Sequence, residues 1–174
     1  MTFDLTKIDL ALLNSMTKYP SIPTYHTLDP KNGALSEPAS AFEGDVIGTE
    51  KVDGTNSRII LTPDGRYLIG SREELLHADG DLIANPAMGI AAALKDTAER
   101  LRQAHHNRLT VYYFETFGGR ITSASKEYTA CGAVGLRLFD VIDINDPAAL
   151  LAKPIEQISA WRENGGQSFS RNTT

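Results

Sequence analysis

The sequence predicts an α+β domain with an antiparallel sheet at its centre, and three observations favour this class. Runs rich in β-branched and aromatic residues are separated by short Gly-containing turns, which is typical of antiparallel strands. One long Ala- and Leu-rich helical pattern interrupts these runs. The 174 residues, of which 41% are hydrophobic, are enough to bury one core. We therefore expect a single domain over residues 1–174.

The chain opens with an amphipathic helical pattern and then a Pro- and Ser-containing stretch at 20–38, which favours a long surface loop or extended arm. Residues 1–44 thus form an N-terminal helix and arm, and residues 45–143 form the core that carries the motifs below. The expected strands of this core are 45–51, 56–61, 67–70, 109–117 and 134–141. Helical patterns cover 86–104 and, after the core, 154–161.

Composition narrows the classes of function. The net charge of −5 works against strong nonspecific binding to nucleic acid, which depends on many basic contacts with phosphates. A single cysteine excludes an internal disulfide bond and fits a reducing compartment. The four histidines show no metal-ligand spacing, so we expect no metal site built from protein side chains. With neither a signal peptide nor a membrane span in the pattern, we expect a cytoplasmic protein without a membrane partner.

The most informative segment is residues 49–58, with the sequence TEKVDGTNSR and the pattern Lys-x-Asp-Gly-x-Asn inside it. Four fixed positions should recur by chance about once in a thousand chains of this length. A lysine accepts a nucleotide only as the neutral amine, which burial and neighbouring cations favour. We expect strand 45–51 and the Asp53-Gly54 turn to place Lys51 at the edge of a cleft. Asn56 and Arg58 would then point to one face of the next strand, where Arg58 can bind a phosphate or a carboxylate.

The same segment has a simpler interpretation as a hairpin turn with a solvated lysine. Asp-Gly is a common hairpin turn, and we interpret Asp64-Gly65 as only a turn. Three further segments favour the functional interpretation because they occur in the order and rough spacing of a known family. They are Ser71-Arg72, YYFETFGG at 112–119 and LRLFDV at 136–141.

Together the four segments resemble the covalent lysine nucleotidyltransferases, and within that superfamily the ATP-dependent RNA ligases. Glu50 and the Gly-x-Asn continuation are closer to RNA ligases than to DNA ligases, which usually carry arginine where this chain has Asn56. The resemblance implies an antiparallel-sheet, ATP-grasp-like adenylylation domain. It also implies that Lys51 is the catalytic residue that becomes adenylylated. The cofactor-binding positions of the first motif are then Glu50, Val52, Gly54 and Asn56.

The other three segments each supply one residue under this resemblance. Arg72 would contact the triphosphate or the nicked end, Glu115 the ribose hydroxyls, and Phe139 would stack on the adenine. Taken alone, Arg72 heads a plausible helix start and is an ordinary exposed charge. Phe139 taken alone is a core residue, and only the family context favours base stacking.

The resemblance covers residues 46–143. The family's two later motifs, an acidic-Gly-x-Val strand that helps bind metal and a lysine-rich strand that neutralises the triphosphate, have no match in the remaining sequence. We therefore expect a domain that is incomplete at its C-terminus. Three explanations stay open: a truncation, a partner chain that completes the site, or a nucleotide-binding relic with little turnover.

The predicted function is that of an ATP-dependent RNA ligase. It would use ATP with Mg²⁺ (or Mn²⁺) to form lysyl-AMP, transfer AMP to the 5′-phosphate of nicked or broken RNA, and seal the phosphodiester. One alternative is a noncatalytic module that binds nucleotides or RNA ends. Another is a DNA ligase or a GTP-using capping enzyme.

Overall fold

The computed structural model describes residues 3–22, 24–39, 41–46, 48, 50–78, 81–82, 89–104, 107–119, 121, 125–129 and 132–170. The chain divides into two compact units. The first, called the main body here, comprises Met1–Tyr19 and Val52–Thr174, and the second, called the arm unit, is Pro20–Lys51.

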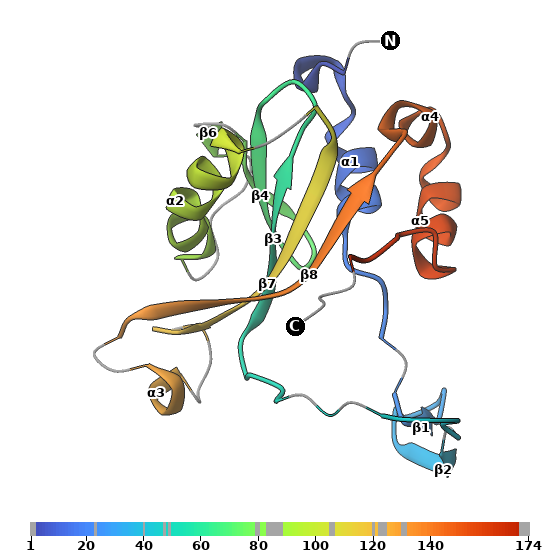
Figure 1. Ribbon diagram of the computed structural model, residues 1–174. Coiled ribbons are helices and arrows are strands. Elements are labelled where there is room, and N and C mark those ends of the chain that lie inside the picture. The colour runs from blue at the N-terminus through green and yellow to red at the C-terminus, as the bar shows by residue number, and fades with distance from the viewer. Residues whose placement is uncertain are drawn as a thin grey trace. The chain divides into compact units, whose positions relative to one another are not determined.

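The main body is built on a six-stranded antiparallel sheet with the order β6-β5-β4-β3-β7-β8 (Figure 1). Its strands are β3 (Thr55–Leu61), β4 (Tyr67–Ser71), β5 (Leu75–Ala78), β6 (Asp81–Leu82), β7 (Leu109–Gly118) and β8 (Val134–Ile144). The β3–β4 hairpin closes at Gly65, whose φ of +80° is in the left-handed region. The interpretation of Asp64-Gly65 as a turn is thus confirmed.

Helices cover both faces of this sheet (Figure 1). The helices of the described residues are η1 (Leu5–Lys7), α1 (Leu10–Thr17), α2 (Ile90–Gln103), α3 (Ser125–Tyr128), α4 (Pro147–Leu151) and α5 (Ile155–Glu163). On one face Ile59 and Leu61 pack with Leu94 of α2. On the other face Ile60 packs in a cluster that includes Leu13 of α1 and Ile158 of α5.

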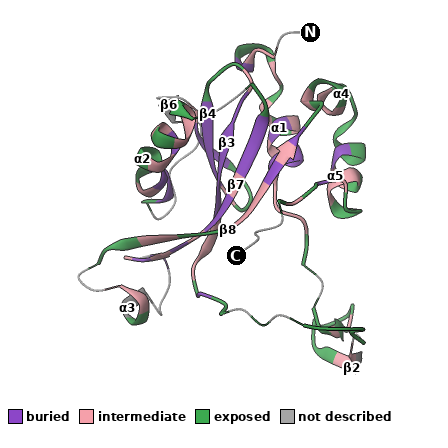
Figure 2. Ribbon diagram, viewed as in Figure 1, coloured by how far each residue is buried: buried purple, intermediate pink, exposed green. Residues whose placement is uncertain are grey.

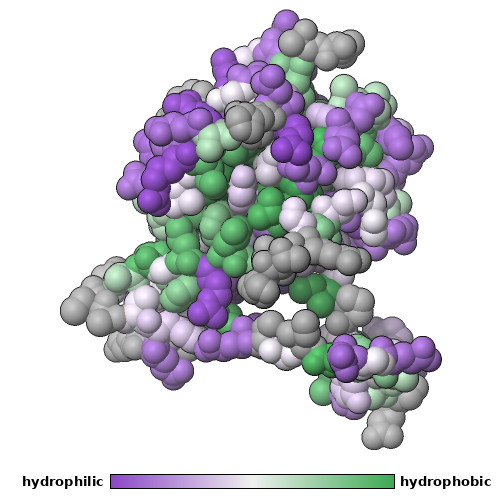
Figure 3. Space-filling model, viewed as in Figure 1, coloured by the Kyte–Doolittle hydropathy of each residue, from purple (hydrophilic) through white to green (hydrophobic). Residues whose placement is uncertain are grey.

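A strand buried on both faces reads as a continuous apolar run, as β3 does at its C-terminal end. Figure 2 shows burial concentrated in β3, β4 and β7. β8 is more open, with Val134 and Leu138 exposed at 40% and 44%. Figure 3 shows hydrophobic surface gathered over the middle of the main body, between hydrophilic patches.

None of the helices in the described ranges is long and apolar enough to cross a membrane.

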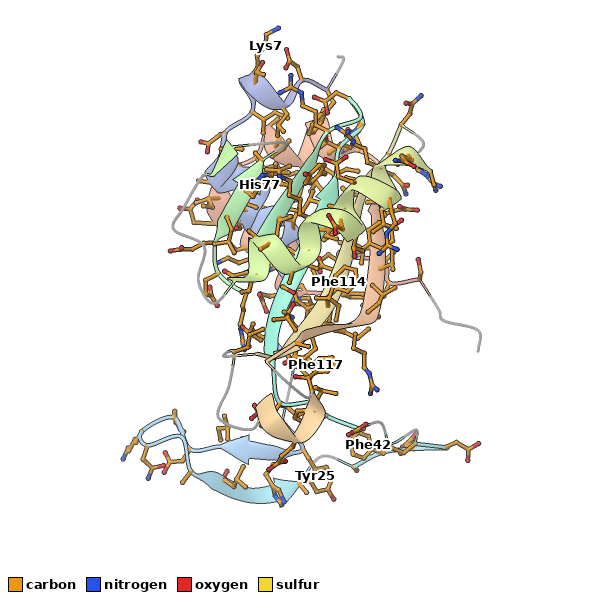
Figure 4. All side chains as sticks on the ribbon, turned by 90° about the vertical axis from the view of Figure 1, so that its left-hand side faces the viewer. Lys7, Tyr25, Phe42, His77, Phe114 and Phe117 are labelled. Atoms are coloured by element: carbon orange, nitrogen blue, oxygen red, sulfur yellow. The ribbon has the colours of Figure 1, made fainter. Side chains whose placement is uncertain are left out.

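The arm unit contains an antiparallel hairpin of β1 (His26–Leu28) and β2 (Leu35–Ala39). The connecting turn closes with a hydrogen bond of 2.8 Å from the Asp29 amide to the Ala34 carbonyl, and Gly33 adopts a φ of +69° within it. The rings of Tyr25 and Phe42 stack with centroids 5.6 Å apart (Figure 4). The hydrophobic side chains of this unit are largely exposed, since Tyr25 and Phe42 expose 54% and 62%.

The predicted α+β class with an antiparallel sheet is confirmed, but three local predictions are wrong. The described residues of 45–51 contain no strand, because β-branched composition sets a local preference and cannot supply a pairing partner. The stretch at 20–38 holds a hairpin instead of a continuous loop. The helix start suggested at Arg72 is a tight turn between β4 and β5. The helix predicted for 86–104 begins at Ile90, and residues 86–88 lie outside the described ranges.

Candidate functional site

The pairing of β3 with β7 brings the first and third sequence motifs together. Asn56 lies directly opposite Glu115, and Thr55 lies opposite Thr116. Side chains of residues paired in register point to the same face of a sheet. Residues two apart on a strand also share a face, so Asn56 and Glu115 lie on the same face as Ile60, which packs with α1 and α5.

Gly54 approaches β7 too closely for any side chain. A Cβ at this position would lie 2.5 Å from the carbonyl oxygen of Thr116 and 2.9 Å from Cγ of Glu115. Real Cβ atoms do not make contacts this short, so the position requires glycine for reasons of space. The backbone of the first motif therefore lies directly against Glu115.

Asn56 has a buried side-chain oxygen, Oδ1, with no hydrogen-bond partner in the protein. An unpaired buried acceptor costs about 1–3 kcal/mol. Glu115 beside it is half-buried, and an ionised carboxylate is also an acceptor. Two neighbouring acceptors fit a ligand that brings donors, such as the two hydroxyl groups of a ribose.

The segment before Gly54 is anchored in the main body. The side chain of Val52 is 6% exposed, and the backbone amide of Asp53 donates to the hydroxyl of Tyr128 at 3.3 Å. Tyr128 belongs to α3, and its ring packs edge-to-face with the ring of Phe117 of β7, with the ring centroids 5.8 Å apart. α3 therefore fixes the turn that follows the motif lysine in the sequence.

Glu50 and Lys51 are the last two residues of the arm unit, and both are exposed. The peptide bond between Lys51 and Val52 joins the two units. The other six predicted site residues belong to the main body: Val52, Gly54, Asn56, Arg72, Glu115 and Phe139.

Arg72 occupies the turn between β4 and β5. Its side chain is 74% exposed, and its Nε lies 3.5 Å from Oε1 of Glu73. Arg58, in contrast, is fully buried. Its guanidinium donates to the backbone carbonyls of Ser71 and Arg72 and to Oδ1 of Asn14. The expectation that Arg58 binds a phosphate or a carboxylate is therefore wrong, whereas the face of the strand predicted for it is right.

Burial lowers the pKa of Arg58 to about 10, which still leaves the guanidinium charged at neutral pH. The charge is thus held inside the protein by the carbonyl and amide oxygens it contacts.

Phe139 is half-buried and packs against the core cluster on the α1 and α5 face. Its ring meets Tyr19 edge-on at 5.2 Å and lies 6.3 Å from the ring of Tyr113. The hydroxyl of Tyr19 donates to Oδ2 of Asp140 at 2.5 Å. Burial and this hydrogen bond raise the pKa of Tyr19, so it remains a donor at neutral pH. Phe139 has a clear packing role in the structure, and its stacking on adenine stays a prediction.

Sequence reasoning missed Arg137 of β8. This exposed residue is the register partner of Glu115, so Asn56, Glu115 and Arg137 form one row across three neighbouring strands. Strand pairing shifts between Tyr113 and Phe114 through an irregularity. No sequence pattern reports such a shift, so the alignment of Arg137 with Glu115 could not be predicted.

Other possible ligand sites lie away from this row. Among the described residues, no group of three or more His, Cys, Asp and Glu side chains could hold a metal ion. A hollow of about 410 Å³ lies beside α5, lined by residues that include Lys153, Trp161 and Gly166. No predicted site residue lines it, and it brings together no pair of catalytic groups. Of the predicted site residues, Asn56 and Glu115 lie in the row across β3, β7 and β8.

Comparison with known families gives one match, and no curated protein matches the chain. The family model for RNA ligases covers residues 44–170. This match extends past the end of the resemblance found in the sequence and includes α4 and α5. Because it covers well over half of the chain and spans Lys51, Arg72, Glu115 and Phe139, the chain belongs to the RNA ligase family, whose members generally use ATP.

Proposed function

We propose that this protein is an ATP-dependent adenylyltransferase of the RNA ligase type, with Lys51 as the residue that carries AMP. One observation supports the proposal above the others. Gly54 packs closely against Glu115, so the first and third motifs are in contact, and the buried oxygen Oδ1 of Asn56 has no partner beside them. A nucleotide supplies hydroxyl groups that can donate a hydrogen bond to this unpaired oxygen of Asn56.

In the proposed reaction the lone pair of Lys51 Nζ attacks the α-phosphorus of ATP. A phosphorus–nitrogen bond forms, the bond to the bridging oxygen breaks, pyrophosphate leaves, and Nζ gives up a proton. Asn56 and Glu115 accept hydrogen bonds from the ribose hydroxyls and hold the nucleotide in place. Arg72 neutralises charge on the phosphates or on the RNA end.

A magnesium or manganese ion fits this scheme without a protein cage, because Mg²⁺ usually binds through substrate phosphates and only one or two carboxylates. When bound, the ion supplies charge neutralisation at the phosphates. The residues of this chain bind and orient the nucleoside.

The AMP is then transferred to RNA. An oxygen of the RNA 5′-phosphate attacks the phosphorus of lysyl-AMP and releases the lysine, and a 3′-hydroxyl group finally displaces AMP to close the strand. We further propose that both units form one adenylylation domain of the ATP-grasp-like nucleotidyltransferase type. The family match supports this because it spans the boundary at Lys51 and Val52.

The test is covalent labelling with ATP that carries the label in its α-phosphate, in the presence of Mg²⁺. We expect label on the wild-type protein and none on Lys51→Ala. Lys31→Ala is the matched control, because Lys31 is an exposed lysine in the same unit, and it should label normally. Wild-type protein that is folded and takes no label would contradict the proposal.

Parallel reactions separate the alternatives. Nucleotide binding without labelling would identify a noncatalytic binding module. Labelling from GTP in preference to ATP would identify a capping-type enzyme. Transfer to nicked RNA in preference to nicked DNA would identify an RNA ligase, which is the outcome we expect.

A further inference from the structure

Arg58 is the largest fully buried side chain that carries a charge in the described residues. Its guanidinium does not point toward the surface but toward the turn between β4 and β5. Nη1 donates to the carbonyls of Ser71 and Arg72, the latter at 3.2 Å, and Nη2 donates to Oδ1 of Asn14. One buried cation therefore contacts two successive carbonyls of the turn that carries Arg72.

Space is made for this side chain on the neighbouring strand. Gly70 is the register partner of Arg58, and a Cβ at Gly70 would lie 3.0 Å from Cζ of Arg58. A contact this short forces the guanidinium to shift. Gly70 thus allows Arg58 to lie across β4 and reach the turn.

The rest of the turn is held by hydrogen bonds of its own and by α1. Oγ of Ser71 accepts from the amides of Glu73 at 3.3 Å and Glu74 at 3.1 Å. Nδ2 of Asn14 donates to the carbonyl of Glu73 at 2.9 Å, and Nζ of Lys18 lies 2.8 Å from the Glu73 carboxylate. The carbonyls of residues 71, 72 and 73 therefore all accept hydrogen bonds from the side chains of Arg58 or Asn14, while the Arg72 side chain is exposed.

We propose that Arg58 is a positioning residue that fixes the Ser71–Glu74 turn and so presents Arg72 to the phosphates of the nucleotide or the RNA end. This inference rests on the proposed function for the role of Arg72. The planar guanidinium suits the task because its fixed fork of donors reaches several acceptors at once. A lysine at this position has a single nitrogen and cannot bond both carbonyls and Asn14 in the same geometry.

The structural half of the inference is tested by amide hydrogen exchange on Arg58→Met and Arg58→Lys. Arg162→Met is the matched control, because Arg162 is also mostly buried and its Nη1 also donates to α1 at Ser15, including Oγ at 3.3 Å. We expect exchange of the Glu73 and Glu74 amides to rise about tenfold or more in Arg58→Met and little in Arg162→Met, with Arg58→Lys between them. Equal protection of the turn in Arg58→Met and wild type would overturn the inference.

The functional half is tested by the rate of labelling against ATP concentration for Arg72→Ala, Arg58→Met and the double variant. We expect Arg58→Met to reproduce the defect of Arg72→Ala within about threefold, and the double variant to be no worse than Arg72→Ala, because both changes remove one function. Arg162→Met should keep wild-type kinetics below its unfolding temperature. Independent, multiplicative losses in the double variant, or wild-type kinetics in Arg58→Met, would overturn the inference.

The two failures can be told apart. A wild-type protein that takes no label contradicts the proposed function, and the exchange experiment then still tests whether Arg58 holds the turn. A wild-type protein that labels, combined with an Arg72→Ala variant that labels and transfers AMP normally, leaves the AMP step standing and overturns the role inferred for Arg58.

Discussion

The two ends of the β3–β7 pair differ in burial and polarity. At one end Ile60 lies opposite Val111, and both are fully buried in the core beneath α1 and α5. At the other end Asn56 lies opposite Glu115, and the buried oxygen of Asn56 has no partner. The same two strands thus pass from a packed apolar core to an incompletely satisfied polar row.

Under the proposed function, the apolar end of the pair supports folding and the polar end supports nucleotide binding. Close packing at the apolar end lowers the free energy of the folded state. The unpaired acceptor at the polar end raises it, and such features concentrate at functional sites. Changes at the apolar end should therefore reduce stability, and changes at the polar end should reduce nucleotide use.

The largest effect on stability is expected at the apolar end. Ile60→Ala removes a fully buried side chain and should lower the free energy of unfolding by about 2–5 kcal/mol. Labelling by ATP should persist at temperatures where the variant is folded. Ile155→Ala is the control, because Ile155 is 41% exposed and its loss should cost less than about 1 kcal/mol. Urea unfolding measures both, and equal losses would contradict the assignment of the core.

Gly54→Ala should have the largest effect on function. Its Cβ would collide with the Thr116 carbonyl at 2.5 Å, so the first motif must move away from β7. A displacement of this kind can cost about 100-fold in the labelling rate. Gly48→Ala is the control because a Cβ there meets nothing within 4 Å. Normal labelling by Gly54→Ala would show that the close approach to Glu115 is not needed.

Asn56 and Ser57 are neighbours on β3, and we expect one to affect nucleotide use and the other to affect stability. Asn56→Ala should slow labelling at low ATP about 5- to 10-fold, with stability unchanged or raised, because an unpaired buried oxygen is removed. Ser57→Ala should do the reverse, since Ser57 is fully buried and bonds Thr116 at 2.5 Å. Its loss should cost about 0.5–1.5 kcal/mol without changing the labelling rate. Thermal unfolding measures the stability of both variants, and labelling measures their activity. A loss of stability in Asn56→Ala with slow labelling in Ser57→Ala would contradict the prediction.

The smallest effect concerns the turn that carries Arg72. A hydrogen bond from Lys18 lowers the pKa of Glu73 below its ordinary value of 4.5. Because the folded pKa is lowered, the pair stabilises the protein above pH 4.5, and this stability is lost as the pH falls through the lower folded value. Both partners are partly exposed, so Lys18→Met should cost less than about 1 kcal/mol at pH 7. The difference from wild type should shrink as the pH falls below 4.5, and a difference that grows would contradict the pairing.

Much of the main body could be predicted from the sequence. The apolar run of β3, the Asp64-Gly65 turn and the long pattern of β7 are local signals, and the structure confirms each of them. The β1–β2 hairpin was missed although Asp29-Pro30 and Gly33 are turn residues, because its strands are short and weakly apolar. Strand β5 was missed because Ser71 also suits a helix start.

The site could be predicted only in part for a similar reason. Alternation along β3 correctly places Asn56 and Arg58 on one face. It does not reveal that Arg58 is buried, since that depends on Gly70 of the neighbouring strand. The pairing of Glu115 with Arg137 depends on an irregularity in β8 and also leaves no trace in the sequence. The local sequence pattern predicts which face of a strand a residue occupies. Which residues become its neighbours depends on the register between strands, which the local pattern does not contain.

The central claim is that the polar end of β3 and β7 holds a nucleotide for transfer to Lys51. The most direct test is to incubate the wild-type protein with ATP and Mg²⁺, locate the adenylyl group by peptide mass spectrometry, and then add pyrophosphate. We predict one adduct, on Lys51, that pyrophosphate removes with the formation of ATP. An adduct on another residue, an adduct that resists pyrophosphate, or no adduct on a folded protein would contradict the claim.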